Sequence, residues 1–459
     1  MSISRRAVLA TAAALPAVSL LGGAQIASAA TGKTYYVAED GDDKAAGTAE
    51  STPWQSVNQV VTAINAGQIV RGDTILFKCG QTFYGQFTEL ANLQGEGRIT
   101  FGAYGSGEKP QLMGYKVLNK PDAWKNIGGN QWQIELAAGN YVGNTCTDNA
   151  NVGFLLLDGK VHGKRKFSDE GKLEGDLEFY SVKNGEKSTT LTVYSESNPS
   201  SRGDLRVAVD GRIFSAVSNL TVQDLDLIGC GGHGIQVGSG ASGVEILRNR
   251  IRYIGGSHLL DNDRSSIKHS RYGNGVEMWI GSSDVLVQDN AIEDVYDVAV
   301  TLQGNQEGKF LGWKNVHVTK NAITRCSQSF EIWSQGSNKG SGTGYVNCSF
   351  TENNCTNAGI ESWGQEVRPN PDEGGVHLLS YSEELPIELS ITGNQFINAK
   401  NAYMYRLPKN KTQLVIDKNV IQLAAGQKLQ QQRSETIEQH AAWSGATGFD
   451  ANSEFKIGG

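Results

Sequence analysis

The feature that most constrains the fold is a short string that recurs through the second half of the chain. In each copy, apolar and polar residues alternate, an Asn follows, and another apolar residue stands soon after it. The copies carry Asn249, Asn290, Asn321, Asn353, Asn394 and Asn419, at intervals of 41, 31, 32, 41 and 25 residues. Alternation with period two predicts a strand, and the Asn predicts a bend before the next strand.

A repeat of this length and pattern predicts a solenoid of β-coils. A single coil cannot bury its apolar row until its neighbours stack on it, so the chain is expected to form a parallel β-helix. The longer intervals then mark coils that carry inserted loops. Asn suits the bend because it tolerates left-handed backbone angles and because its amide can bond along the stack to the next Asn.

The rest of the chain divides by composition and pattern. Arg5-Arg6, a short uncharged stretch and Ala27-Ser28-Ala29 predict a twin-arginine signal peptide that is too short to span a bilayer, and therefore a secreted or periplasmic protein. We expect that signal peptide over 1–29, an N-terminal cap and first coils over 30–115, a β-rich insertion over 116–215, the main coils with a groove over 216–421, and a C-terminal cap or tail over 422–459.

Charge and cysteine content narrow the possible partners. The formal net charge of −7 argues against a protein that binds nucleic acid by neutralising phosphates. The 6 cysteines include no Cys-x-x-Cys pair that would suggest a zinc or redox site. We expect buried thiols, with one disulfide as the alternative, and neither a cofactor nor a metal.

Several strings near the N-terminus resemble a known group of proteins. Thr34-Tyr-Tyr-Val37, Gly41-Asp-Asp43, Pro53-Trp54 and Gly72-Asp-Thr-Ile75 resemble the start of pectate-lyase-like right-handed β-helix carbohydrate enzymes. The segment around Leu157-Asp158-Gly159 is similar to the insertion of β-xylosidase-like members. The resemblance implies an all-β, right-handed parallel β-helix and a carbohydrate polymer or oligosaccharide as partner. It carries no catalytic residue across, because several reactions use this scaffold.

Alignment of the strands that precede the Asn repeats brings acidic and indole side chains into one column. The residue before each Glu is apolar and points inward, so period-two geometry turns the Glu and the Trp outward on the same face. The aligned pairs are Glu277 with Trp279, Glu331 with Trp333, and Glu361 with Trp363. The preceding coil continues the column with Gln236, and the coil with Ala299 and Thr301 leaves a gap with Asp297 at its edge.

Such a column can bind and cleave a sugar chain. Indole rings stack on the apolar faces of sugars, and two carboxylates can serve as acid and as base or nucleophile. With coils ~4.8 Å apart, Glu331 and Glu361 would lie ~5 Å apart, as in a retaining enzyme, and Glu277 and Glu331 ~9–10 Å apart, as in an inverting one. One carboxyl of such a pair should have a raised pKa and supply the proton.

Two polar loops are expected to flank the column. The loop before Glu277 contains His258, His269 and Arg271, and the loop after Trp363 ends at His377. These side chains could orient a sugar hydroxyl, neutralise a uronate carboxylate or abstract a proton.

The sequence leaves three functions open. A glycoside hydrolase is favoured because the column is acidic and aromatic. A polysaccharide lyase would act on a uronate polymer by β-elimination, with a base from the loop and calcium held by the carboxylates. A glycan-binding protein without catalysis is the third. The Glu column could also be merely solvated or bind calcium, with its Trp residues covered by the insertion.

Overall fold

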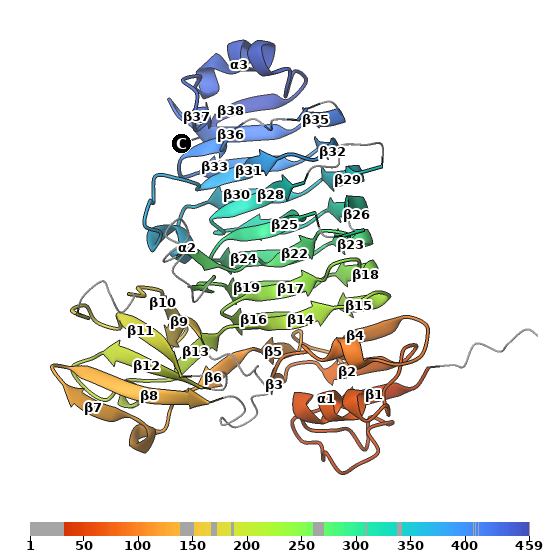
Figure 1. Ribbon diagram of the computed structural model, residues 1–459, viewed down its shortest axis with the longest axis vertical. Helices are drawn as coiled ribbons and strands as arrows, with labels where there is room; N and C mark the ends of the chain where they lie inside the picture. Colours follow the sequence, from red (N-terminus) through yellow and green to blue (C-terminus); the bar gives the residue numbers. More distant parts are fainter. Residues whose placement is uncertain are drawn as a thin grey trace, which may run out of the picture. The chain divides into compact units, whose positions relative to one another are not determined.

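The computed structural model shows that the chain winds into stacked β-coils (Figure 1). The structure describes residues 32–137, 151–166, 172–184, 188–259, 270–306, 308–309, 311–336, 342–406, 408, 410–411 and 413–458. The predicted signal peptide lies outside these residues. The expected all-β parallel β-helix with an N-terminal cap and a β-rich insertion is confirmed. No helix among the described residues is both long and apolar enough to cross a membrane.

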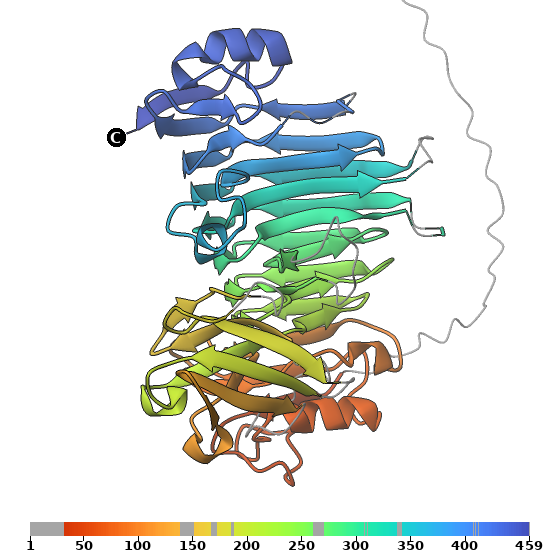
Figure 2. The ribbon, with the colours of Figure 1, turned by 60° about the vertical axis from the view of Figure 1, so that its left-hand side comes forward.

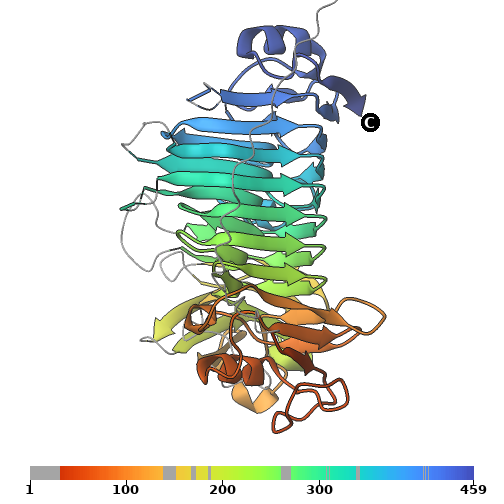
Figure 3. The same ribbon diagram turned by 90° about the vertical axis from the view of Figure 1, so that its right-hand side faces the viewer.

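Each main coil adds one strand to each of three parallel sheets, which we call A, B and C (Figure 3). Sheet A consists of β1 (Thr34–Val37), β2 (Thr74–Lys78), β4 (Ile99–Tyr104), β15 (Leu220–Gln223), β18 (Ser242–Leu247), β23 (Ser283–Gln288), β26 (Gly312–Thr319), β29 (Gly344–Thr351), β32 (Ile387–Thr392) and β35 (Gln413–Asp417). Sheet B consists of β3 (Thr82–Tyr84), β5 (Gln111–Met113), β16 (Asp226–Cys230), β19 (Arg250–Ile254), β24 (Ala291–Val295), β27 (Ala322–Thr324), β30 (Asn354–Ala358), β33 (Gln395–Ala399), β36 (Val420–Ala424) and β38 (Glu454–Gly458). Sheet C consists of β14 (Arg212–Ala216), β17 (His233–Val237), β22 (Val276–Trp279), β25 (Val298–Asn305), β28 (Gln328–Gln335), β31 (Val376–Glu383), β34 (Ala402–Met404) and β37 (Lys428–Gln430).

The repeated Asn residues form a buried ladder between sheets A and B. The backbone N–H of Asn290 donates to Asn321 Oδ1 at 3.0 Å, and the side-chain amide of Asn290 donates to the same oxygen at 2.9 Å. The predicted bonding along the stack is therefore present. The left-handed backbone lies one residue earlier than expected, as at Asp289 (φ 55°) and Lys320 (φ 57°), because the Asn itself must point inward to reach its neighbours.

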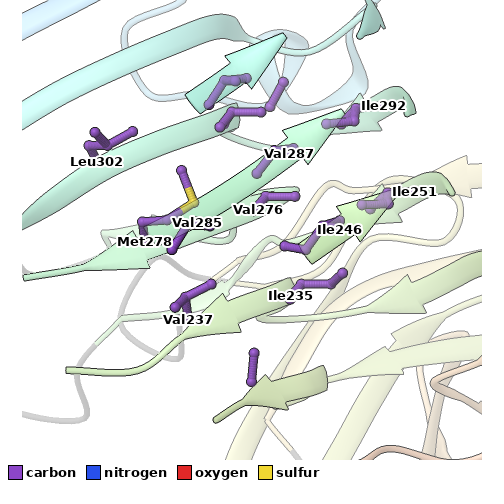
Figure 4. Packing of buried hydrophobic residues seen from close by; sticks show 14 of the residues in the cluster. Ile235, Val237, Ile246, Ile251, Val276, Met278, Val285, Val287, Ile292 and Leu302 are labelled. Atoms are coloured by element: carbon purple, nitrogen blue, oxygen red, sulfur yellow. The ribbon is translucent and has the colours of Figure 1, made fainter. Parts of the chain in front are cut away.

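The interior is filled by the alternate residues of all three sheets (Figure 4). Val276 and Met278 of β22 are fully buried, and they stack on Ile235 and Val237 of β17, which pair with them in register. Burying a side chain of this kind contributes ~1.5–3 kcal/mol, so the stacked rows are the main source of stability.

Both ends of the solenoid are covered. At the N-terminal end lies α1 (Val57–Asn65), whose N-cap Ser56 accepts a hydrogen bond from the backbone N–H of Gln59 at 3.1 Å. At the C-terminal end, η4 (Ile437–Gln439) and α3 (His440–Thr447) place Trp443 in the core. Asp450 ends the ladder by accepting a hydrogen bond from the amide of Asn419 at 3.1 Å.

The β-rich insertion is built from two antiparallel sheets, drawn in orange to yellow-green in Figure 2. One contains β6 (Tyr115–Val117), β9 (Val152–Leu157), β10 (Lys160–His162) and β13 (Leu205–Val209), and the other contains β7 (Lys125–Gly128), β8 (Gln131–Ala137), β11 (Phe179–Asn184) and β12 (Ser188–Tyr194). The chain also forms short 3₁₀ turns: η1 (Leu90–Asn92), η2 (Pro121–Ala123) and η3 (Pro199–Ser201). The insertion has its own core around Leu155, Phe179, Leu191 and Val207.

The described cysteines carry free thiols. Cys230, Cys326, Cys348 and Cys355 are buried, and Cys79 is partly exposed. Burial raises the pKa of the Cys348 thiol to about 12, so this thiol stays protonated. Cys146 lies outside the described residues.

Candidate active site

The acidic column of sheet C exists, but its register differs from the predicted one. Glu277 pairs with Thr301, and Thr301 pairs with Glu331, so the two glutamates stand two rungs apart as expected. The prediction placed Ala299 between them, which is wrong by two residues. β25 begins at Val298, opposite Gln328, so its first residues form a corner that β22 lacks. Because the shift is two residues, Thr301 keeps its predicted outward face, whereas Ala299, which was expected to point outward, is buried in the core beside Val300.

The third pair does not lie on this column. Glu361 is exposed in a turn with φ 51°, and Trp363 begins the short helix α2 (Trp363–Glu366), which Ser362 caps. The next rung of sheet C presents Leu379 beside Glu331. The predicted placement of Glu361 and Trp363 is therefore wrong, because the loop that joins β30 to β31 contains the same local string without being a strand.

Trp363 supports the loop instead of facing solvent. Its ring packs against Phe154 of the insertion at 4.8 Å and Tyr296 at 5.4 Å, and its indole N–H donates to the carbonyl of Asp294 at 2.8 Å. The other two indoles, Trp279 and Trp333, are half-buried on the outward face that also carries Glu277 and Glu331.

A pocket of about 500 Å³ opens at the start of β25 and β28, with Asp297 and Glu331 in its wall. Its lining also includes Arg271, Tyr296, Gln328, Arg368, Leu379, Tyr381, Tyr405 and Arg406. Arg368, Pro369, Asn370, Glu373 and Gly374 of the loop after α2 form another side of the pocket. The pocket thus combines the carboxyl groups of Asp297, Glu331 and Glu373 with cationic and phenolic side chains.

Glu331 is almost fully enclosed and favours its neutral form. Its side chain is buried with 3% exposure, and the hydroxyl of Thr301 donates to Oε2 at 2.7 Å. Burial raises the pKa of the carboxyl to about 8, and the negative charge of Asp297 acts in the same direction. The hydrogen bonds from Thr301 and Tyr381 oppose this shift only in part. At neutral pH Glu331 therefore holds a proton that it can donate.

The carboxyl group of Asp297 is held in place by cationic and amide groups. Arg368 forms an ion pair with Asp297 Oδ1 at 2.5 Å, and its guanidinium lies 5.1 Å from the centre of the Tyr296 ring. When the side-chain amide nitrogen of Gln328 faces Asp297, it donates a hydrogen bond to Asp297 Oδ1 at 3.1 Å. Burial lowers the pKa of Arg368, but Asp297 more than offsets this, so the guanidinium stays charged.

Glu277 has the opposite character to Glu331, although it is as deeply buried. It forms an ion pair with His233 and accepts a hydrogen bond from the Gln236 amide at 3.1 Å. Burial raises the pKa of Glu277, but His233 and Gln236 bring it below the usual value. The ring Nδ1 of His233 accepts the backbone N–H of Asn274 at 3.1 Å, which leaves Nε2 facing Glu277.

The predicted loop residues have different locations. Arg271 lines the pocket and is fixed by backbone carbonyls, those of Gly256 at 2.7 Å and of Gly153 at 2.8 Å. His258 lies on the short hairpin β20 (Ser257–His258) and β21 (Arg271–Tyr272). His269 lies outside the described residues.

His377 is inside the solenoid, so the expectation that it flanks the groove is wrong. It is fully buried 5.3 Å from the Phe396 ring, and its Nδ1 is 3.0 Å from the Ser329 hydroxyl. Burial lowers its pKa to about 3. The cause is the corner at the start of β31, where two successive side chains turn inward.

Sequence reasoning placed Thr301 on the rung with the gap but did not predict its contact with Glu331, and it did not identify Tyr381 or Arg368 as site residues. Tyr381 follows Trp333 on the next rung, so alignment of β31 with β28 would have found it. Arg368 comes from an aperiodic loop and had no comparable signal. Together, the fold and the pocket define a parallel β-helix protein in which Glu331, with its raised pKa, and Asp297 line one pocket.

No family model matches the chain. A stretch of 149 residues is 34% identical to lacto-N-biosidase of Bifidobacterium longum subsp. longum. This stretch covers 29% of this chain and 9% of that protein. Among solved structures, XylC with xylose has a TM-score of 0.49 at 12% identity, covering 86% of this chain and 69% of that chain. The GH136 lacto-N-biosidase from Eubacterium ramulus has a TM-score of 0.38 at 13% identity, covering 93% and 68%.

Proposed function

We propose that the chain is an exported glycoside hydrolase that cleaves an oligosaccharide or polysaccharide with Glu331 as general acid and Asp297 as the second catalytic carboxyl group. The observation that carries this proposal is that both carboxyl groups line one pocket, while burial and the charge of Asp297 raise the pKa of Glu331 to about 8. Two carboxyl groups in different protonation states are what hydrolysis of a glycosidic bond requires.

The proposed reaction uses each group in one defined step. Glu331 donates its proton to the glycosidic oxygen as the bond from that oxygen to the anomeric carbon breaks. Asp297 faces the positive charge that develops on the sugar, and it acts either as nucleophile or as the base that takes a proton from water. Water supplies the hydroxyl group of the new reducing end, and a final proton returns to Glu331.

The surrounding residues support this division of roles. Arg368 and Gln328 hold Asp297 in place through the contacts described above, and Arg368 compensates its charge. The negative charge of Glu277 makes a smaller contribution that also raises the pKa of Glu331. Trp333 and Tyr381, whose ring centres are 6.1 Å apart, offer faces on which a sugar can stack.

The comparison guides the choice of substrate. Because one stretch is similar to a protein named lacto-N-biosidase, oligosaccharides that end in lacto-N-biose belong in the first panel. Export by the twin-arginine route is part of the proposal, and it is supported by Arg5-Arg6 and the small residues near position 29.

The decisive experiment is hydrolysis of a glycan panel by the mature protein, with products identified by mass and by absorbance of a new double bond. We expect hydrolytic products, a loss of at least 10³-fold (an order-of-magnitude expectation for removal of a general acid, about 10²–10⁴) in E331Q, and retained sugar binding. E361Q is the matched control, because Glu361 is exposed and lies outside the pocket. An unsaturated product, or full activity of E331Q, contradicts the proposal.

A further inference from the structure

A second pocket lies on the same two strands as the first. It has a volume of about 340 Å³ and is lined by Asn305, Gln306, Gly308, Gln335 and Gly336. Asn305 and Gln335 are the last residues of β25 and β28, and they pair directly across the sheet. The lining residues carry no charge and offer amide groups, which donate and accept hydrogen bonds as sugar hydroxyls do.

The two pockets are on one face of sheet C. Along β28, Glu331, Trp333 and Gln335 alternate with the inward-facing Ile332 and Ser334, which are buried. Along β25, Thr301, Gln303 and Asn305 take the equivalent outward positions. The acid, the aromatic residue and the amide therefore follow one another in a single outward row.

The spacing of this row fits a chain of sugars. Glu331 and Gln335 are four residues apart, which is about 13 Å along a strand and longer than one sugar ring. Trp333 stands halfway, half-buried, with Gln303 beside it on the neighbouring rung. A ring that stacks on Trp333 would thus connect a sugar in the Glu331 pocket to a sugar over the amide pocket.

We propose that the amide pocket is a distal subsite for a neutral sugar, so that the protein binds neutral oligosaccharides of at least three units along β25 and β28. This inference rests on the proposed function for the position of the cleaved sugar. It adds the length and the charge class of the substrate. Neutral sugars are favoured because the described lining residues of the amide pocket include no cation that would compensate a carboxylate or a sulfate.

The test is equilibrium binding of E331Q to a glycan array that holds neutral and acidic oligosaccharides of one to four sugars. Binding should strengthen with each sugar up to the third. In the background of E331Q, the further change Gln335→Ala should weaken binding of trisaccharides about 3- to 10-fold, as the loss of one or two hydrogen bonds would, and leave monosaccharide binding unchanged. Asn305→Ala should act in the same way.

Gln395→Ala is the matched control, because Gln395 is an exposed Gln on a strand of sheet B. Equal effects of Gln335→Ala on one-sugar and three-sugar ligands overturn the subsite, as does binding confined to acidic glycans. Length-dependent binding without hydrolysis by the native protein keeps the subsite and overturns the hydrolase. Hydrolysis by the native protein, together with binding that does not strengthen when a third sugar is added, keeps the hydrolase and overturns the subsite.

Discussion

Thr301 lies between Glu277 and Glu331 on adjacent rungs of sheet C, and its hydroxyl donates to Glu331 Oε2 at 2.7 Å. Glu277 pairs instead with His233, so two buried glutamates on one face have pKa values shifted in opposite directions. This difference arises from their partners, since both are at most 3% exposed. In the proposed reaction, Glu331 is therefore the glutamate that supplies the proton.

The Thr301 hydroxyl should set the upper pH limit of activity. Burial raises the pKa of Glu331 to about 8, and the hydrogen bond from Thr301 opposes this rise. Thr301→Val removes that bond with little change of shape, so the pKa should rise further. We expect the alkaline limb of kcat/KM to move up by about one pH unit, since hydrogen bonds to charged groups contribute ~1.5–3 kcal/mol. Thr319→Val on sheet A is the control. If Thr301→Val leaves the alkaline limb of kcat/KM unchanged, Thr301 does not set the pKa of Glu331.

Glu331 should also make stability depend on pH. Its pKa is about 8 in the folded chain against 4.5 in the unfolded chain, so the folded state keeps a proton that the unfolded state loses. Stability therefore falls as pH rises from about 4.5 to about 8. E331Q does not titrate, so its stability relative to the native protein should increase over this range by about 3–5 kcal/mol. Urea unfolding of both proteins at pH 5 and pH 8 measures this, and an equal difference at the two values refutes it.

The Asn ladder should be a major source of stability. The side chain of Asn321 accepts from Asn290 and donates to Val287 O at 3.0 Å and to Asn353 Oδ1 at 2.9 Å. Asn321→Ala leaves buried groups without partners, at ~1–3 kcal/mol each, so we expect a loss of at least about 3 kcal/mol in the free energy of unfolding. The control is Asn354→Ala, which changes the exposed first residue of β30. It should change the free energy of unfolding by less than ~0.5 kcal/mol.

The sequence was most informative where a physical requirement repeats. An inward Asn must be satisfied by its neighbours, so the ladder and the coil axis could be inferred from the repeated string. The same reasoning assigned Glu277, Glu331 and their Trp partners to the outward face. It could not detect a slip of two residues at Ala299, because such a slip preserves the alternation.

The pocket was less accessible to this reasoning. Glu361 and Trp363 carry the local pattern of a strand, but a capping Ser362 starts a helix there. Arg368 meets Tyr296 and Asp297 only through the folded loop, and no sequence periodicity predicts these contacts. Glu331 and Asp297 could both be named from the sequence, whereas the groups that surround these two carboxyls required the tertiary structure.

Trp363 should couple the insertion to the pocket. Its ring lies between Phe154 and Tyr296, and Arg368, five residues later, holds Asp297. Trp363→Ala opens a cavity and removes the hydrogen bond to Asp294, so we expect a loss of about 3–5 kcal/mol in stability. Because the loop then releases Arg368, kcat/KM should fall at least about tenfold, as expected when positioning is lost. Trp363→Phe should restore part of both quantities. Trp132→Ala, in the insertion but outside the pocket lining, is the control, and a Trp363→Ala variant that loses stability without losing activity shows that the loop does not position Asp297.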